Sequence, residues 1–581
     1  MKSVIRHGRE WHVAPSPDAA LVSEIQRALP SSRSFAVVLA RRGGSNWTKL
    51  IDPDLSNLHS PFTLRDIDKA LSRLIRAIEN EEGVFIHGDF DVDGLSGAAV
   101  LYQGLLPFHT KGRIKVDVGD RRRGHGLSCE FVRRAIDEGF ALVVTADCGI
   151  SNVNEIAALN QAGIDTIVTD HHLISNSLPP ALAIIDPHRP DGTYPNRHLA
   201  GVGVAYKLIC ALHERLERPH PSHLLDLVAL GTIADLVPLS EDGEVENRAM
   251  IREGFSLMAH EEGSSLGLRV LMDKLSVNPK KLTCSNIGYA IAPKLNAANR
   301  AGDPKVAFLL LTTGQAKRAE YLTEILLDYN RDREIAQEDL ISQAETKMAE
   351  HEIDPEEDGI IILAGKHWNE GILGLVASNL ADRHHVPTII LSIGDRTSRA
   401  SCRSVEGFDI AACLEAHADL LLHHGGHRMA AGFSVSNEHL PELRDRLLDY
   451  VAKEGTPTPR KHVPNMIDGE ITAGEIDLSI YRNLRSLAPY GPGNPAPLFL
   501  LKGAALEEMS LVGAHRQHTK GMVVQDGFSL PFIAFRMGRH IDLFETADHA
   551  SVICRVGFDD WQECVQLEIV DLVTDRAVSP G

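Results

Sequence analysis

The sequence predicts an α/β protein: a parallel-sheet domain, a long connecting helix, a smaller α/β domain and a C-terminal β-barrel. Four apolar runs rich in β-branched residues, at 84–86, 141–147, 165–170 and 181–186, are typical of strands. Helix-like stretches at 128–138 and 153–162 separate several of them. Strands that alternate with helices indicate a doubly wound parallel sheet, in which ligands bind beyond the carboxyl ends of the strands.

The first predicted strand is followed by the sequence HGDFDVDG. Side chains at alternate positions of an extended strand end face the same way, so Asp89, Asp91 and Asp93 converge, with His87 in step. Like charges this close repel strongly, and a bound cation offsets the repulsion. The segment therefore predicts a metal site. The alternative is an acidic turn whose aspartates cap a helix beginning near Leu95.

Acidic residues also end the later strands. Asp147 ends the second run and Asp170 the third, and two histidines follow Asp170 directly to give the tripeptide DHH. Asp235 follows a further short apolar run that begins at Leu225, and we expect it at the same edge of the sheet. Such an edge carries enough carboxylates and imidazoles for two divalent cations that share a bridging carboxylate.

The chain of 581 residues is too long for one core and suggests three or four domains. Residues 315–352 contain no Pro or Gly, and apolar residues recur there at helical spacing, which predicts a helix that bridges two domains. The expected parts are an N-terminal extension at 1–61 packed on the first domain, the sheet domain at 62–313, the long helix at 314–352, the smaller α/β domain at 353–453, a linker at 454–465 and the barrel at 466–575.

Within the smaller α/β domain, strands are predicted at 359–365 and 388–394 and a helix at 373–383. The glycine-rich sequence GGHRMAAG follows, and it either lets the backbone approach a ligand closely or forms a tight turn before a strand at 432–435. Short alternating strands at 504–512, 522–525, 530–535, 550–556 and 564–573 predict the small barrel.

The net charge of −20 argues against a broad nucleic-acid-binding surface. Basic residues nevertheless cluster at 121–123, at Arg396 with Arg399 and Arg403, and at 460–462. Such clusters form either a confined positive groove for a single strand or ordinary solvated surface. No apolar stretch is long enough to cross a bilayer, no signal peptide is evident, and the eight cysteines form no C-x-x-C pair, so we expect a cytoplasmic protein without membrane contact.

The spacing of HGDFDVDG, the isolated Asp147, the DHH triplet and Asp235 resembles the four motifs of the DHH phosphoesterase superfamily. Seven further segments, in order, resemble its RecJ family of single-stranded-DNA exonucleases: GHGLS, GVGVAYKL, GTIADLVPL, APKLNAANR, RASCRS, GGHRMAAG and PYGPGNPAPLF. The chain departs from the family at His125, where Tyr is frequent, and at Asn299, where Gly is frequent. Asn299 is expected to alter a backbone turn before Arg300.

The resemblance implies a two-metal phosphodiester hydrolase that uses Mn²⁺, with Mg²⁺ as a substitute. It places one ion on His87, Asp91 and Asp147, and the other on Asp93, Asp147, His171 and Asp235, with Asp89 either a ligand or an outer contact. Asp147 is then the bridging ligand. Asp170 orients a histidine of the DHH triplet, and His172 faces the phosphate as donor or proton source.

The same resemblance names the domains DHH, DHHA1 and OB-fold. It places the pocket for the 5′ end at Arg121, Arg300, Ser401 and Arg403, and the substrate loop of DHHA1 at Gly426 and His427. In the OB-fold, candidates for base stacking are Phe499, Phe532, Phe535 and Trp561, although aromatic residues of a small barrel also form its core.

The implied activity is 5′-to-3′ digestion of single-stranded DNA to 5′-mononucleotides in repair and recombination, by a monomer that works with single-strand-binding protein. Two alternatives stay open. One is a DHH phosphodiesterase or pyrophosphatase for short oligonucleotides, cyclic dinucleotides or pyrophosphate. The other is a non-catalytic scaffold of the same fold, which the full set of Asp and His residues at the ligand positions argues against.

Overall fold

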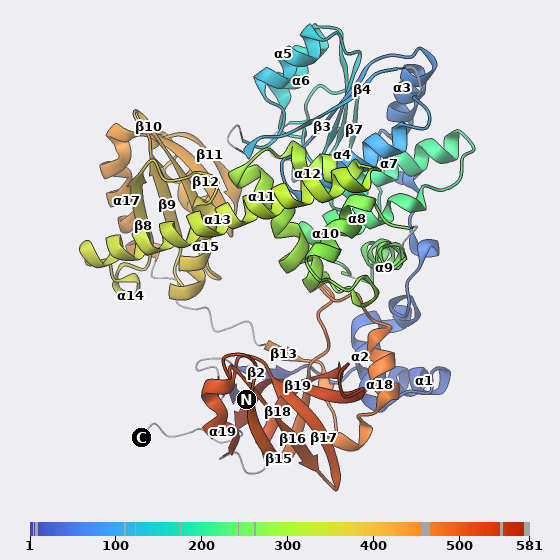
Figure 1. The fold of residues 1–581 in the computed structure, drawn as a ribbon, viewed down its shortest axis with the longest axis vertical. Helices are drawn as coiled ribbons and strands as arrows, with labels where there is room; N and C mark the ends of the chain where they lie inside the picture. The colour runs from blue at the N-terminus through green and yellow to red at the C-terminus, as the bar shows by residue number, and fades with distance from the viewer. Residues whose placement is uncertain are drawn as a thin grey trace.

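The computed structural model describes residues 1–3, 5, 10–109, 112–121, 124–174, 177–241, 243–260, 263–454, 465–545 and 550–574. Three bodies are distinct in Figure 1: an N-terminal α/β domain, a smaller α/β domain joined to it by one long helix, and a barrel near both chain ends. This order matches the fold class that the sequence predicts. The basic cluster at 460–462 and most of the predicted linker lie outside the described residues.

The N-terminal domain is built on five parallel strands in the order β4 (Ile114–Val118), β3 (Val84–Gly88), β5 (Leu142–Ala146), β6 (Asp165–Thr169) and β7 (Ala183–Ile185). Neighbouring positions of one strand face opposite layers of helices. Ile86 packs in the core that includes α3 (Ile67–Glu79), α4 (Val92–Leu105) and α7 (Gly201–Arg215). Phe85 packs in the core that includes α5 (Cys129–Asp137) and α6 (Val153–Gln161). The predicted doubly wound sheet is confirmed.

Asp235 lies close to Asp93 and His171, as expected, but it does not follow a strand. The apolar run before it is the helix α8 (Leu225–Ala234), and Asp235 is its C-terminal cap. Residues 225–233 of this helix are all buried. A short run that is apolar on every side has the same pattern in a buried helix and in a buried strand, so periodicity does not distinguish them.

The long predicted helix is confirmed as α13 (Ala316–Glu350). Its first half packs through Leu322 and Leu326 in the core of the N-terminal domain, which also includes residues of α9 (Glu246–Met258), α10 (Leu266–Lys274), α11 (Ala292–Ala301) and α12 (Lys305–Thr312). Its second half packs on the smaller domain through Leu340 and Ala344. The helix therefore connects two separate cores (Figure 1).

The smaller domain has a five-stranded sheet in the order β11 (Leu421–His427), β12 (Ala430–Ser436), β10 (Thr397–Arg403), β9 (Thr388–Ile393) and β8 (Ile361–Lys366). Only β8 and β9 run parallel. The glycine-rich segment forms the end of β11 and the hairpin into β12. Helices of this domain are α14 (Pro355–Asp358), α15 (Leu373–His384), α16 (Ile410–Glu415) and α17 (Leu440–Glu454).

The C-terminal barrel closes through β15 (Phe499–Val512), β16 (His518–Gln525), β17 (Phe528–Ala534), β19 (Cys564–Thr574) and β18 (Ala550–Asp559), which pairs again with β15. Short elements around it are β13 (Asn465–Ile467), β14 (Gly469–Glu470), α18 (Leu478–Arg485) and α19 (Ile541–Glu545). Phe499 and Phe532 are fully buried in the barrel, so they are core residues and not stacking candidates. Phe535 and Trp561 are exposed.

The N-terminal extension packs mainly on the barrel and not, as we expected, on the first domain. β1 (Lys2–Ser3) pairs with β19, and β2 (Trp11–Val13) pairs with β13. The helices α1 (Ala19–Ala28) and α2 (Arg33–Gly43) bury Ile25 and Phe35 in the same core as Ile480 of α18. The first residues of the chain thus complete its last domain (Figure 1). Among the described helices, none combines the length and apolar composition that a membrane span requires.

Candidate metal centre and substrate cavity

The HGDFDVDG motif turns sharply from β3 into α4. Gly94 permits this turn, since a Cβ there would lie 2.5 Å from the backbone nitrogen of Asp89. Asp91 caps the helix, because its Oδ1 accepts from the backbone N–H groups of Asp93 at 3.0 Å and Gly94 at 3.2 Å. The capping alternative therefore holds for one oxygen of Asp91. The turn also brings Asp89 and Asp91 close to Asp147, with one oxygen of each within 4.8 Å of the others.

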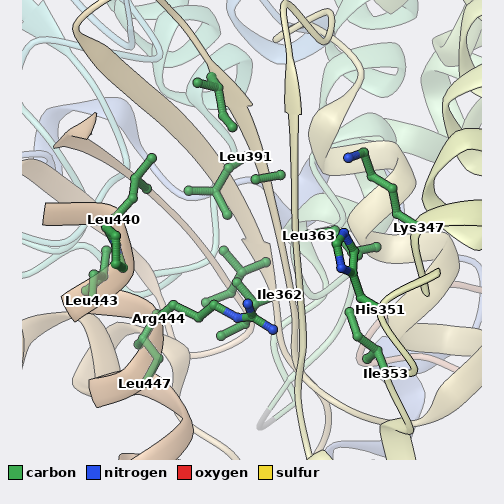
Figure 2. Close-up of a pocket in the computed structure, with 14 residues that line it drawn as sticks. Lys347, His351, Ile353, Ile362, Leu363, Leu391, Leu440, Leu443, Arg444 and Leu447 are labelled. Carbon is green, nitrogen blue, oxygen red and sulfur yellow. The ribbon is translucent and has the colours of Figure 1, made fainter. Parts of the chain in front are cut away.

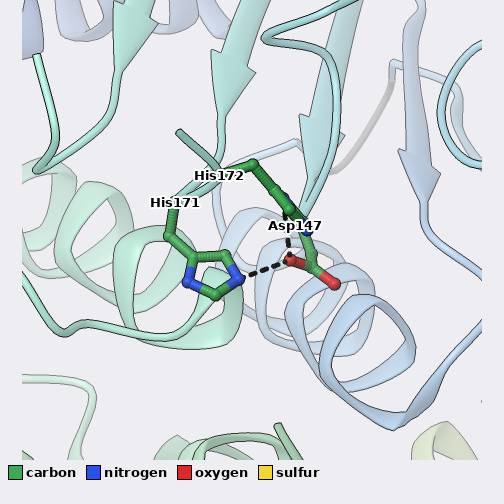
Figure 3. Close-up of side chains that lie close together, drawn as sticks. All are labelled: Asp147, His171 and His172. Atoms are coloured by element: carbon green, nitrogen blue, oxygen red, sulfur yellow. Dashed lines mark ion pairs between the residues drawn. The ribbon is translucent and has the colours of Figure 1, made fainter. Parts of the chain in front are cut away.

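Asp147 lies at the centre of the cluster. It follows β5 directly in a left-handed backbone conformation with φ 61°, which few residues other than glycine adopt. Its Oδ1 lies 3.1 Å from His171 Nε2 and 3.9 Å from His172 Nδ1 (Figure 3). Gly201 packs against it so tightly that a Cβ at Gly201 would lie 2.4 Å from the Cβ of Asp147. The strained backbone and the close packing fix this carboxylate in place.

Three groups of potential metal ligands meet here: Asp89 with Asp91 and Asp147, Asp147 with His171 and His172, and Asp93 with His171 and Asp235. The third group is brought together by helix ends. Asp93 accepts from the N-terminal N–H groups of α7, Gly201 at 2.7 Å and Val202 at 2.9 Å. His171 Nε2 lies 3.5 Å from Asp235 Oδ2 and 3.9 Å from Asp93 Oδ2. Asp147 belongs to the first two groups and His171 to the last two, so the three groups are linked.

The electrostatics of these groups favour a bound cation. Burial and then repulsion from neighbouring carboxylates raise the pKa of Asp93 to about 7 and the pKa of Asp235 to about 9. The same causes raise the pKa of Asp147 well above its ordinary value. Asp89 Oδ1, Asp147 Oδ1 and His171 Nε2 are buried and have no hydrogen-bond partner among the described residues. Buried polar atoms normally have a partner, and a divalent cation between them supplies one.

Asp170 and His172 form a separate pair beside the cluster. The fully buried Asp170 accepts from His172 Nδ1 at 2.7 Å and from the backbone N–H groups of His171 at 2.7 Å and Ile150 at 2.9 Å. Burial alone would raise the pKa of Asp170, but these hydrogen bonds lower it below the ordinary range. Burial lowers the pKa of His172 and the bond to Asp170 raises it, with a net upward shift. With Nδ1 held, the Nε2 of His172 is the atom left for a substrate or a metal.

A cavity of about 360 Å³ lies between the two α/β domains and contains the predicted phosphate-binding side chains. Arg121 and Arg300 line it from the N-terminal domain, and Ser401 and Arg403 from β10. Arg300 donates to the carbonyl of Gly371 across the domain boundary at 2.8 Å. These four side chains, far apart in the sequence, therefore share one cavity. Gly426 and His427 are not among the described residues that line this cavity. Both lie at the end of β11.

Three regions of the sequence match known domain families: residues 83–232 the DHH family, N-terminal domain, residues 357–453 the DHHA1 domain, and residues 467–571 the RecJ OB domain. The single-stranded-DNA-specific exonuclease RecJ of Haemophilus influenzae is 31% identical over 85% of this chain and 88% of its own length. That of Thermus thermophilus is 33% identical over 86% and 70%. The chain belongs to the RecJ family.

Solved RecJ structures also share this architecture. The crystal structure of RecJ from Thermus thermophilus with Mn²⁺ matches with a TM-score of 0.81 at 29% identity, over 99% of this chain and 81% of that one. The structure of the same protein with Mg²⁺ matches with a TM-score of 0.75 at 28% identity, over 98% and 79%. The ions in those two RecJ structures are the ones that the sequence predicts for this site.

One predicted ligand of the RecJ-type site, His87, does not join the described groups. Its Nδ1 lies 3.4 Å from Asp117 Oδ2, and its Nε2 lies 3.3 Å from the carbonyl oxygen of Gly126. Asp117 in turn accepts from Arg134 at 2.6 Å. Asp89 stands in the group where we expected His87. The sequence gives the spacing along β3, but the strand β4 that carries Asp117 was not predicted.

Sequence reasoning also missed residues that surround the RecJ-type site. Asn299 lies within the helix α11 and not at a turn, and its side chain accepts from Arg121 at 3.2 Å and donates to the carbonyl of Phe90 at 2.7 Å. His125 Nδ1 lies 3.2 Å from Asp89 Oδ1. His423 lines the cavity between the two α/β domains. The departures from the family pattern at 125 and 299 were the available signal for two of these residues.

Proposed function

We propose that this RecJ-family chain is a single-stranded-DNA-specific exonuclease. It digests in the 5′-to-3′ direction, releases 5′-mononucleotides and acts in DNA repair and recombination. The main support is the convergence of three ligand groups that are linked through Asp147 and His171, beside a cavity lined by Arg121, Arg300 and Arg403. Sequence identity of 31% to an exonuclease of this name supports the reaction and the substrate.

The donor set fits two divalent cations, Mn²⁺ or Mg²⁺, because carboxylates and imidazoles are their ligands and because three of the buried ligand atoms have no hydrogen-bond partner among the described residues. In this proposal, Asp89, Asp91 and Asp147 would hold one ion, and Asp93, His171 and Asp235 would hold the other. Asp147 would be the ligand that the two ions share. When bound, such ions activate a water molecule and offset charge on the phosphate. His87, the other predicted ligand of the first ion, stays part of the proposal: its Nδ1 lies 3.4 Å from Asp117 Oδ2 and has no hydrogen-bond partner among the described residues.

The protein's own side chains position the substrate. Asp170 holds His172 by the 2.7 Å bond to Nδ1, so that Nε2 faces the scissile phosphate as donor or proton source. Arg121, Arg300, Ser401 and Arg403 hold a terminal 5′-phosphate, for which planar guanidinium groups offer paired donors. Recognition of that extra charge explains why the enzyme begins at one strand end. The Gly426–His427 end of β11 contacts the strand farther from the scissile bond.

We further propose that the chain is a cytoplasmic monomer that works with single-strand-binding protein, and that the domain limits are those predicted above, with the N-terminal extension assigned to the barrel. The exposed aromatic residues Phe535 and Trp561 are the proposed stacking positions of the barrel. Light scattering of the purified chain tests the monomer. Digestion of strands coated with single-strand-binding protein tests that partnership.

The deciding experiment is digestion of one long single strand labelled at either end, with Mn²⁺ present. Release of a 5′-labelled mononucleotide before any 3′ label supports the proposal. Equal cleavage of a double strand, release of the 3′ label first, or activity confined to dinucleotides and cyclic dinucleotides contradicts it. Confinement to short substrates would favour the small-substrate phosphodiesterase, for which the C-terminal barrel has no evident use.

A further inference from the structure

Asn299 of α11 connects the turn that carries the proposed metal ligands with the cavity between the two α/β domains. It is buried, and it is one of the two positions at which the chain departs from its family. Asn299 is not among the described residues that line the cavity, but its side chain contacts Arg121, which does line it. The proposed reaction so far gives Asn299 no role.

The hydrogen bonds of Asn299 fix the direction in which its amide group points. Nδ2 donates to the carbonyl oxygen of Phe90 at 2.7 Å. A carbonyl oxygen accepts and never donates, so the NH₂ group must face Phe90 and the amide oxygen must face the other way. There Oδ1 accepts from the Nε of Arg121 at 3.2 Å. The main chain at Phe90 therefore sets the acceptor that holds Arg121.

Arg121 is held by two contacts that both lead to Phe90. One is the bridge through the amide of Asn299 to the carbonyl of Phe90. The other is the ring of Phe90, whose centroid lies 4.4 Å from the Cζ of Arg121. Phe90 itself stands between Asp89 and Asp91, two proposed ligands of one ion. The position of the Arg121 guanidinium is therefore tied to the backbone that carries those ligands.

With its Nε occupied, Arg121 has two terminal nitrogens left for a ligand. Among the described residues, neither of them has a hydrogen-bond or ion-pair partner. The cavity also gathers like charges: burial, and then the nearby guanidinium groups of Arg121, Arg333 and Arg403, lower the pKa of Arg300 to about 9. A phosphate offsets this repulsion, and two of its oxygens match the paired N–H groups at the end of a guanidinium.

We propose that Asn299 is a positioning residue, which presents Arg121 to the 5′-terminal phosphate at a fixed distance from the metal centre. It acts through Arg121 and does not itself touch the strand. A terminal phosphate held at a set distance brings the first phosphodiester bond, and not a later one, to the metal centre. The inference rests on the proposed function, since it takes Arg121 as a ligand of the strand end.

The test is the preference of the full chain for a phosphorylated strand end. A short thymidine strand with fluorescein at its 3′ end carries either a 5′-phosphate or a 5′-hydroxyl group, and EDTA prevents its hydrolysis. Fluorescence anisotropy gives the ratio of the two Kd values, which should favour the phosphate about tenfold or more in the wild-type chain. Asn299→Ala should lower this ratio about fivefold, because Arg121 loses its acceptor. Alanine keeps the helix α11, since its helix propensity exceeds that of asparagine.

A double-mutant cycle separates positioning from a general structural role. Arg121→Gln should also lower the preference for the phosphate. The other side chains of the cavity, Arg300 and Arg403, then leave part of that preference measurable. Adding Asn299→Ala to Arg121→Gln should cause no further loss, because Asn299 acts through Arg121.

Two matched controls carry the same substitutions elsewhere. Asn196→Ala removes another buried asparagine of the N-terminal domain, whose amide donates to Glu246 and accepts from the backbone of His198. Arg444→Gln removes an arginine from a separate, mainly apolar cavity of about 330 Å³ on the smaller domain (Figure 2). The two cavities have no described lining residue in common. Both variants should keep the wild-type preference for the phosphorylated end.

A wild-type preference in Asn299→Ala overturns the inference, and so does a wild-type chain that binds both strand ends equally. If Asn299→Ala lowers the preference as much in the Arg121→Gln chain as in the wild-type chain, Asn299 acts independently of Arg121 and the inference also fails. Digestion with Mn²⁺ is a separate measurement. A wild-type chain that digests no single strand contradicts the proposed nuclease function, while the binding ratios still decide the role of Asn299.

Discussion

Two buried aspartates at neighbouring strand ends should respond in opposite ways to the same substitution. Asp170 follows β6 and Asp186 follows β7. Hydrogen bonds lower the pKa of Asp170 despite its burial, whereas burial raises the pKa of Asp186 to about 7. At pH 8 the ionised Asp170 therefore stabilises the fold, and the ionised Asp186 destabilises it. Asp170→Asn should lower the stability at this pH, and Asp186→Asn should raise it.

The magnitudes follow from the contacts. Asp170 Oδ1 accepts from three donors, His171 N, His172 N and His172 Nδ1, and Oδ2 accepts from Ile150 N. An asparagine amide that keeps the first three bonds turns its NH₂ toward the N–H of Ile150, and a buried unpaired donor costs about 1–3 kcal/mol. A carboxyl whose pKa rises to about 7 opposes folding by up to about 4 kcal/mol once ionised. Asp186→Asn removes this buried negative charge and keeps a side-chain oxygen that accepts from the backbone N–H of His188.

The assay is thermal melting of each variant at pH 8 and pH 5, together with digestion of single-stranded DNA. The ionised Asp186 lowers the stability of the fold by the full amount above about pH 7, where it is charged in the folded protein. Below about pH 4, the pKa of an aspartate in the unfolded chain, it has no such effect. The gain from Asp186→Asn should therefore shrink toward pH 5. Asp170→Asn should also lower nuclease activity about 10–100-fold, since it loosens His172, and Asp186→Asn should leave it nearly unchanged. Equal Tm shifts of one sign in both variants would refute this reasoning.

Further predictions concern the metal centre and the cavity. Asp147→Ala should abolish nuclease activity while the circular dichroism spectrum stays that of the folded protein; activity near wild type contradicts its bridging role. Gly201→Ala should weaken Mn²⁺ binding about tenfold or more in calorimetry, because its Cβ would lie 2.4 Å from the Cβ of Asp147, whereas Gly203→Ala, whose nearest contact is 3.3 Å, should not. Mn²⁺ at 100 times its Kd should stabilise the wild-type chain by about 2.7 kcal/mol and the Asp147→Ala chain by less. Arg300→Lys should slow digestion of 5′-phosphorylated strands more than of 5′-hydroxyl strands; equal slowing argues against an end pocket.

Local patterns in the sequence were sufficient to predict which acidic residues lie at the edge of the N-terminal sheet. Strand period and the acid after each strand placed Asp89, Asp147 and Asp170 beyond the carboxyl ends of parallel strands, where the structure has them. The same is true of α13, because a span of helical period without Pro or Gly leaves few other conformations. These features depend on residues that are only a few positions apart, so local sequence patterns are enough to predict them.

Other features depend on which distant surfaces fit together, and only the tertiary structure decided them. Asp235 lies close to His171 although it comes from a helix end, Asp117 lies 3.4 Å from His87, and Arg300 shares one cavity with Ser401 of the other domain. The first helices of the chain bury Phe35 in the last domain. An apolar or charged pattern shows that a segment must pack against something. Which segment it packs against depends on shape complementarity between parts of the chain hundreds of residues apart, and a local pattern does not contain that information.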